Sequence, residues 1–210
     1  MKADVVILGG GLAGLTLARQ LERELPRAEV VVVERAELPV RERTHKVGES
    51  LVEASSYYLR DVLGLAAHLE ARHVPKLGLR FFFGDGAPRP IGERLEYGVF
   101  RPPGLAPEDD FTGLLVPSHQ IDRGRLENHL AAELRARRIV RRVASVELAS
   151  GGPHRVRLDG GDTIEGRWVV DASGRRRLLA RQGGLARALP RGARALWARV
   201  GVPLRVEDWT

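Results

Sequence analysis

The sequence predicts an α/β fold built around a parallel sheet, and three observations near the N-terminus support this. Residues 5–8 (VVIL) form a short apolar run of the kind that makes a strand buried on both faces. A glycine-spaced stretch at 9–14 follows at once, and residues 15–25 then show helical apolar spacing. A second β-branched run occupies 30–33. The order strand, tight turn, helix, strand is that of a dinucleotide-binding unit.

Each residue type in this unit suits the binding of a pyrophosphate. Gly9 and Gly11 leave the turn without side chains, so that a phosphate can approach the backbone closely. Gly14 lets the helix lie close to the strand, and the first helical N–H groups face the phosphate with the positive end of the helix dipole. The residues predicted to form this cradle are Gly9, Gly11, Leu12, Ala13 and Gly14.

An acidic residue closes the second strand. Glu34 lies 20 residues after Gly14 and can accept hydrogen bonds from an adenosine ribose. Its carboxylate would repel a 2′-phosphate, which argues against NADP in this site. Glu34 and the adjacent Arg35 therefore join the predicted cofactor-binding residues.

Composition narrows the class of protein. A chain of 210 residues with 43% hydrophobic residues has enough apolar side chains for one large domain or one and a half. Cysteine is absent, which excludes disulfides, thiolate metal sites and a redox-active dithiol; we expect no metal site. The net charge is +7, but no recognition motif accompanies it, so nucleic acid is not an expected partner. We interpret the basic clusters at 135–142 and 175–181 as solvated faces.

Targeting signals are not evident. No apolar run reaches transmembrane length. The apolar start lacks the basic region and cleavage site of a signal peptide, and the glycine motif explains it better. We therefore expect a cytoplasmic protein without a membrane span.

The middle of the chain predicts helices first and then strands, because its apolar residues change from helical to strand spacing. Ser50-x-x-Glu53 has the form of a capping box, which predicts a helix from Ser50 that ends near Gly64. A second helix is expected at 66–72. Strands are expected at 77–83 and 97–100, with a turn at 84–86 and a mobile loop at 102–110.

The later part of the chain predicts one more helix, followed by several strands. Asp122 can cap a helix that runs to about residue 137, and 139–148 reads as one strand. Segments 154–158 and 163–165 predict an antiparallel meander, a further strand is expected at 168–171, and another lies near 195–200. We expect an FAD-binding domain from 1–76 and 119–182, and part of a β-rich substrate domain from 77–118 and 183–210.

The strand at 168–171 ends in the turn Asp171-Ala172-Ser173-Gly174. A dinucleotide unit followed by a helix, a meander and this turn resembles the FAD domain of the para-hydroxybenzoate hydroxylase-like flavoproteins. The resemblance implies a Rossmann-like FAD/NAD(P)-binding domain of three layers (ββα), with the second strand and turn against FAD. The site residues that it implies are Lys46, Gly48, Glu49 and Ser50 after the second strand, Arg123 at a helix start, and Asp171, Ser173 and Gly174.

Two stretches narrow the resemblance. Residues 47–50 (VGES) and 76–81 (KLGLRF) are similar in order and spacing to motifs of the flavin-dependent halogenases. This implies that reduced FAD, oxygen and halide halogenate an organic, probably aromatic, substrate, and that Lys76 is the catalytic lysine. The W-x-W-x-I-P motif of those enzymes is missing, since Trp168, Trp197 and Trp209 are isolated. The chain therefore resembles an N-terminal portion of such a protein or a degenerate relative.

Two alternatives stay open at this point. A related flavin-dependent monooxygenase or a prenyl-chain reductase would share the FAD domain without needing a lysine at position 76. A non-catalytic nucleotide-binding remnant would keep only the fold. No second dinucleotide motif is present, so a separate flavin reductase is a possible partner for the halogenase.

Overall fold

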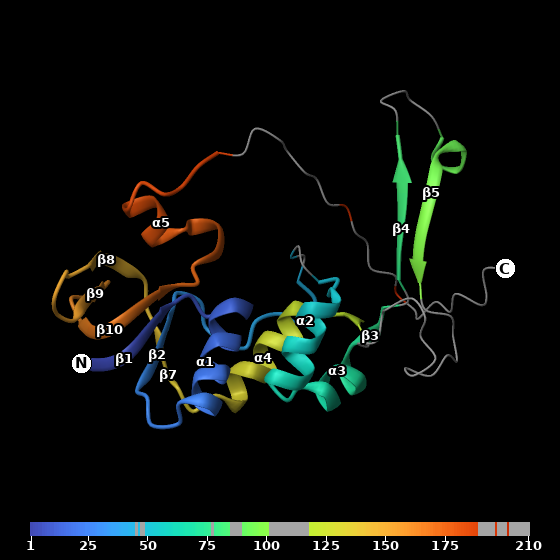
Figure 1. The fold of residues 1–210 in the computed structure, drawn as a ribbon. Coiled ribbons are helices and arrows are strands. Elements are labelled where there is room, and N and C mark those ends of the chain that lie inside the picture. The colour runs from blue at the N-terminus through green and yellow to red at the C-terminus, as the bar shows by residue number, and fades with distance from the viewer. Residues whose placement is uncertain are drawn as a thin grey trace.

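A six-stranded sheet forms one side of the molecule, with the helices beside it (Figure 1). The computed structural model describes residues 1–44, 46, 49–76, 78–84, 90–100, 118–188, 196 and 201. The sheet has the strand order β7-β2-β1-β10-β9-β8. Its strands are β1 (Lys2–Leu8), β2 (Val30–Glu34), β7 (Arg137–Val140), β8 (Val143–Glu147), β9 (His154–Leu158) and β10 (Thr163–Asp171).

Four of these strands are parallel. β1 lies between β2 and β10, with Val5 opposite Val30 on one side and Trp168 on the other. β7 continues the parallel part beyond β2. The apolar run of β1 is buried on both faces, as its sequence predicts, because helices cover one face and the meander covers the other.

The helical layer packs on one face of the parallel strands. Val5, Ile7, Val30 and Val32 point to it and contact Ala18 of α1 (Leu12–Glu24). α4 (Arg123–Glu133) lies beside α1 and contributes Leu126 and Leu130 to a second cluster of leucines. After α2 (Glu53–Tyr57), the one-turn π-helix η1 (Tyr58–Val62), the connection that follows it and α3 (Ala66–Arg72) add Leu59, Leu63, Leu65 and Leu69 to that cluster.

The meander β8-β9-β10 packs on the opposite face. Val6, Leu8, Val31 and Val33 of the parallel strands share a core with apolar residues of β8, β9 and β10, which are Val146, Val156, Leu158 and Ile164. The layers are therefore meander, parallel sheet and helices. This confirms the Rossmann-like three-layer α/β fold.

Two predicted strands have different bounds. The segment 139–148 is not one strand: β7 and β8 lie at opposite edges of the sheet, and Arg141–Arg142 connects them. Apolar alternation alone cannot detect this break. Conversely, 163–165 and 168–171 are parts of the single strand β10, whose first residues pair with β9 and whose later residues pair with β1.

The capping-box prediction at Ser50 is wrong. The helix α2 begins at Glu53 with Val52 at the N-cap position. Ser50 instead forms a β-bridge with Gln120, and its hydroxyl accepts a hydrogen bond from the Gln120 side chain. In the folded chain Ser50 therefore pairs with β6, although its local sequence predicts the start of a helix. Asp122 does occupy the N-cap position of α4, but without a capping hydrogen bond from its side chain.

Short segments join the helices to the next part of the chain. β3 (Val74–Pro75) pairs with β6 (His119–Gln120), and residues 49–51 pair with the other edge of β6. After β3, the hairpin of β4 (Gly78–Phe83) and β5 (Leu95–Phe100) stands away from the six-stranded sheet (Figure 1). A 3₁₀ turn, η2 (Ile91–Glu93), precedes β5.

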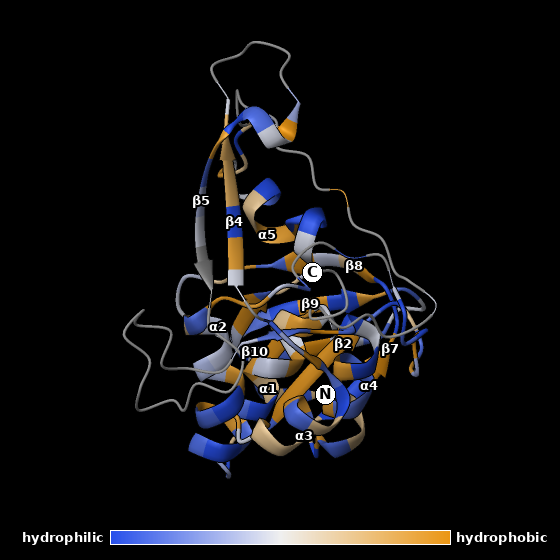
Figure 2. Ribbon diagram, turned by 90° about the vertical axis from the view of Figure 1, so that its right-hand side faces the viewer, coloured by the Kyte–Doolittle hydropathy of each residue, from blue (hydrophilic) through white to orange (hydrophobic). Residues whose placement is uncertain are grey.

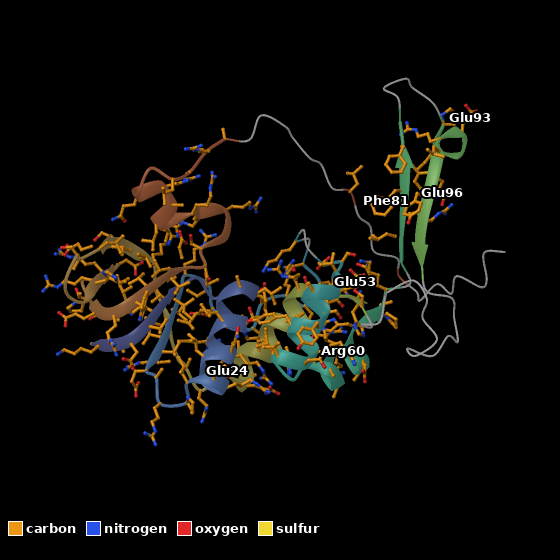
Figure 3. The ribbon with its side chains drawn as sticks, viewed as in Figure 1. Glu24, Glu53, Arg60, Phe81, Glu93 and Glu96 are labelled. Atoms are coloured by element: carbon orange, nitrogen blue, oxygen red, sulfur yellow. The ribbon has the colours of Figure 1, made fainter. Side chains whose placement is uncertain are left out.

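The hairpin has one apolar and one polar face. The cross-strand pairs Phe81–Tyr97 and Phe83–Leu95 share a face with Leu79, and β4 is largely apolar in Figure 2. On the other face Arg80 pairs with Glu96 and lies over the ring of Phe82. Figure 3 labels Glu96, and also Phe81 of the apolar face, on this hairpin. The turn at 84–86, the loop at 102–110 and the strand near 195–200 lie wholly or mostly outside the described residues.

The chain leaves the sheet after β10 through a 3₁₀ turn, η4 (Gly174–Arg176), and a short helix, α5 (Leu178–Gln182). α5 lies next to the end of β10 (Figure 1). This exit turn meets the glycine turn that follows β1, and the two turns together form one wall of the site described next.

Candidate functional site

A pocket of about 820 Å³ opens at the carboxyl ends of β1, β2 and β10. β1 is the point from which the sheet extends in both directions, so this is the crevice where open α/β sheets bind ligands. The pocket-lining residues include Gly9, Gly11, Glu34, Arg35, Lys46, Arg123, Ser173 and Gly174. These predicted site residues come from five separate parts of the chain.

Gly9 and Gly14 are glycines because the protein leaves no room for a side chain. Gly9 has φ +118°, and a Cβ there would lie 2.4 Å from the carbonyl oxygen of Ala172. A Cβ on Gly14 would lie 1.9 Å from the carbonyl oxygen of Gly9. The glycine turn is thus closed against both its own helix and the Asp171–Gly174 turn.

Gly11 is different. A Cβ on this residue would meet only one described atom, Oε1 of Glu127, at 3.9 Å. Its φ of −81° is open to any residue. The described protein atoms therefore do not require glycine at this position, and a side chain here would stand in the pocket. A ligand that approaches the backbone closely does require it.

Glu34 fastens the end of β2 to the glycine turn. Its Oε2 accepts a hydrogen bond from the backbone N–H of Gly10 at 2.7 Å. Its Oε1 accepts from the N–H groups of Arg35 and Ala36, at 2.8 and 3.1 Å. The carboxylate still lines the pocket, so it shapes the turn in addition to the predicted contact with a ribose.

Asp171 acts within its own turn. It accepts hydrogen bonds from the hydroxyl and N–H of Ser173 and from the N–H of Leu179. Burial opposes the charge, but the hydrogen bonds from Ser173, Leu179 and Ala180 outweigh it and lower the pKa of the Asp171 carboxyl. Ser173 and Gly174 line the pocket, whereas Asp171 holds them in place from behind.

A buried carboxylate lies at the N-terminus of α1. Glu127 of α4 is 2% exposed, and its Oε1 accepts a hydrogen bond from the N–H of Leu12 at 3.2 Å. It also accepts from Arg123 at 2.9 Å and, through Oε2, from Lys46 at 2.7 Å. Glu127, which is not among the predicted site residues, thus joins Lys46 and Arg123.

A signal for Glu127 was available. It follows Arg123 by four residues, the spacing of an ion pair on one helix face, and it stands on the buried side of α4 beside Leu126 and Leu130. An acidic residue at a position with core phase is rarely buried unless it is paired.

Arginines surround the rest of the pocket. Arg141, Arg142, Arg175, Arg176 and Arg181 line it. All five are exposed, as the interpretation of the two basic clusters as solvated faces predicts, and they also face this pocket. With Arg35, Lys46 and Arg123, eight basic side chains face two acidic ones, Glu34 and Glu127. This excess of positive charge suits a ligand with several negative charges.

Lys76 lies outside this pocket. Its ammonium donates a hydrogen bond to the carbonyl oxygen of Leu51 at 2.6 Å, and its N–H donates to the carbonyl of Ser118. Ser50 and Glu49 belong to the same small pairing with β6 and do not line the pocket. Gly48 lies outside the described residues.

The part of the chain that the structure describes lacks two other features. It contains no group of three or more His, Asp or Glu side chains placed to hold a metal ion, and none of its helices is long and apolar enough to cross a bilayer.

The residues present fit a dinucleotide. Gly11 leaves space for a phosphate, the N-terminus of α1 opens into the pocket, and Lys46 and Arg123 supply positive charge beside it. Fold and pocket together define a Rossmann-type dinucleotide-binding protein of the flavoprotein kind.

Comparison with known proteins narrows this class. The family model for tryptophan halogenase matches residues 4–90. A 1H-pyrrole-2-carbonyl-[peptidyl-carrier protein] chlorinase of Pseudomonas fluorescens is 32% identical over 207 residues, which cover 87% of this chain and 41% of the relative. A flavin-dependent halogenase of Dictyostelium discoideum, chlA, is 38% identical over 86 residues, or 37% of this chain and 14% of the relative.

A solved structure of halogenase PltM in complex with phloroglucinol and FAD has the same fold, with a TM-score of 0.63 and 19% identity over 87% of this chain and 36% of that one. These matches support a flavin-dependent halogenase family for this chain. The flavin-dependent relatives and the FAD in that solved structure confirm the predicted FAD cofactor at the level of the family. The chain spans less than half the length of these relatives.

Proposed function

We propose that this chain binds FAD noncovalently in the pocket at the end of β1. The observation that carries the proposal is Gly11, whose glycine is explained by a ligand and not by the described protein atoms around it. Gly9, Gly11 and the N–H groups that begin α1 would hold the pyrophosphate, with Lys46 and Arg123 as counter-charges. Glu34 and Arg35 would face the adenosine end, and Ser173 and Gly174 would close the opposite wall.

We further propose that the protein is a halogenase acting on a small organic, aromatic substrate with halide and oxygen. Bound reduced FAD would give two electrons to oxygen, and the oxygen thus reduced to the peroxide level would oxidise halide to hypohalous acid with release of water. The part of this chain is to bind the cofactor, orient it and keep water from it. A flavin reductase as a separate source of reduced FAD, and a cytoplasmic location, stay predictions.

Lys76 is proposed as the lysine that acts on the oxidised halide. Only three of the 34 basic residues are lysines, and an ammonium can donate a compact hydrogen bond or lose a proton and act as a nucleophile, which a guanidinium does not do. Lys76 is held at a defined place by the carbonyl oxygens around residues 51 and 118. Its distance from the pocket lining requires the oxidised halide to move away from the flavin.

The test is halide-dependent product formation. With reduced FAD, oxygen and halide, Lys76→Ala should lose halogenation while flavin reoxidation continues, and Lys2→Ala is the matched control at the other end of the sheet. Halogenation by Lys76→Ala at the wild-type rate would remove Lys76 from the mechanism. Hydroxylated product formed without any halide requirement would instead establish the monooxygenase alternative.

A further inference from the structure

Glu127 occupies the place in the pocket where an anion is expected. Its carboxylate accepts from the N–H of Leu12, the first residue of α1, and from the side chains of Lys46 and Arg123. A helix N-terminus and two cations are the donors that a pyrophosphate would use in this fold. In the free chain these donors already have an acidic partner.

Glu127 is a fixed, buried part of the site, and the two cations are more exposed. The side chain of Glu127 is 3% exposed, while that of Lys46 is 40% exposed and that of Arg123 is 18% exposed. The carboxylate thus lies at the bottom of the pocket and the cations reach it from the pocket side. It comes from α4, whereas Lys46 comes from the segment after β2, so the cluster ties three parts of the chain together.

Charge decides what the cluster does when FAD arrives. Without a carboxylate, two cations and the positive end of a helix would repel one another in the free chain. With it, the donors are held in place, but an incoming pyrophosphate meets a negative charge among them. The same side chain therefore stabilises the free chain and weakens the binding of an anion.

We propose that Glu127 is an internal counter-anion that competes with the FAD pyrophosphate for Lys46, Arg123 and the N-terminus of α1. Cofactor binding transfers these donors from the carboxylate to the phosphates. Glu127 is on this account a residue that sets how tightly FAD is held and how readily it leaves. The inference rests on the proposed FAD site.

The test is Glu127→Gln, which keeps the size and the acceptor oxygen for Leu12 and removes the charge. FAD titrated into the 210-residue chain and followed by flavin fluorescence should show a dissociation constant about tenfold lower than that of the wild type, the effect of one partly screened charge. The free variant should at the same time melt at a lower temperature. Glu133→Gln on the same helix, whose carboxylate pairs with Arg19 outside the pocket, is the matched control and should leave the dissociation constant unchanged.

The outcomes separate the possibilities. A purely structural Glu127 would give a less stable variant that binds FAD equally or more weakly, and this result would overturn the proposal. If Glu127→Gln does not fold, Glu127→Asp takes its place: it keeps the charge but draws it back by one methylene, and it must bind FAD more tightly than the wild type, by a smaller factor. Absence of FAD binding by the wild type itself would refute the proposed function instead.

Discussion

At position 11 a glycine is required by the ligand and not by the packing of the described protein atoms. Its two companions in the glycine motif are enclosed by described atoms, at 2.4 Å for Gly9 and 1.9 Å for Gly14, whereas a side chain on Gly11 would project into open pocket. We expect Gly11→Val to abolish FAD binding in a fluorescence titration and to lower the free energy of unfolding by only about 1 kcal/mol, the cost of a poor N-cap residue. Gly9→Val is the contrasting variant and should fail to fold. FAD affinity retained by Gly11→Val would place the pyrophosphate elsewhere.

Glu34 serves both the fold and the cofactor. Because its two oxygens accept from three backbone N–H groups, Glu34→Ala should lower the free energy of unfolding as well as weaken FAD by about 1–3 kcal/mol. Chemical denaturation and fluorescence titration measure the two effects separately. An unchanged dissociation constant in a destabilised variant would show that Glu34 only shapes the turn.

Single residues show where sequence reasoning succeeds and where it stops. Gly9, Gly14 and Glu34 could be placed from spacing because local chain geometry fixes them. The spacing of four residues from Arg123 could have marked Glu127 as paired, but its contact with the N–H of Leu12, 115 residues away along the chain, could not be predicted. Contacts of that separation depend on how α1 and α4 pack, which no local pattern encodes.

At the scale of the element, three histidines meet where α3 packs on α4. The rings of His68 and His129 are stacked with their centroids 3.7 Å apart, and the ring of His73 lies 5.2 Å from that of His68. Burial lowers the pKa of His68 to about 4, with nearby His129, His73 and Arg72 adding to the effect and Glu133 opposing it. Burial likewise lowers the pKa of His73 to about 4, with Asp122 opposing and Arg125 adding to it.

These shifts predict an acid-labile helical layer. The unfolded chain binds more protons than the folded one between about pH 6.5 and pH 4, so the stability from these groups is complete above pH 6.5 and is lost as the pH falls toward 4. After allowance for partial exposure we expect a loss of about 1–2 kcal/mol for each imidazole. Urea denaturation at a series of pH values should show a shallower loss in His68→Gln than in the wild type, with His154→Gln as control. Equal pH profiles for all three proteins would contradict the assignment.

Helices and strands could be predicted where a single apolar spacing continues through the whole element. β1, α1, β2 and α3 carry strong local patterns, and the structure confirms them. The segment 139–148 looked like one strand because both halves are apolar in alternation, yet β7 and β8 lie at opposite edges of the sheet. The edge of the sheet at which each strand pairs depends on the arrangement of the whole sheet. The pairing of Ser50 with Gln120, which keeps Ser50 out of α2, likewise depends on contacts distant in sequence.

At the scale of the whole molecule, charge and fold point to the same ligand. The pocket gathers eight of the chain's basic side chains at the carboxyl end of the sheet, where three-layer α/β folds bind nucleotides. The overall excess of +7 is thus partly concentrated at one site, which composition alone could not reveal.

Direct titration of the 210-residue chain with FAD tests the central claim, which is that this pocket is a cofactor site. We predict saturable quenching of flavin fluorescence and a rise in the unfolding temperature that increases with the FAD concentration as that dissociation constant requires. Both effects should be absent in Gly11→Val. A folded wild-type chain that shows neither quenching nor stabilisation at any FAD concentration would contradict the account.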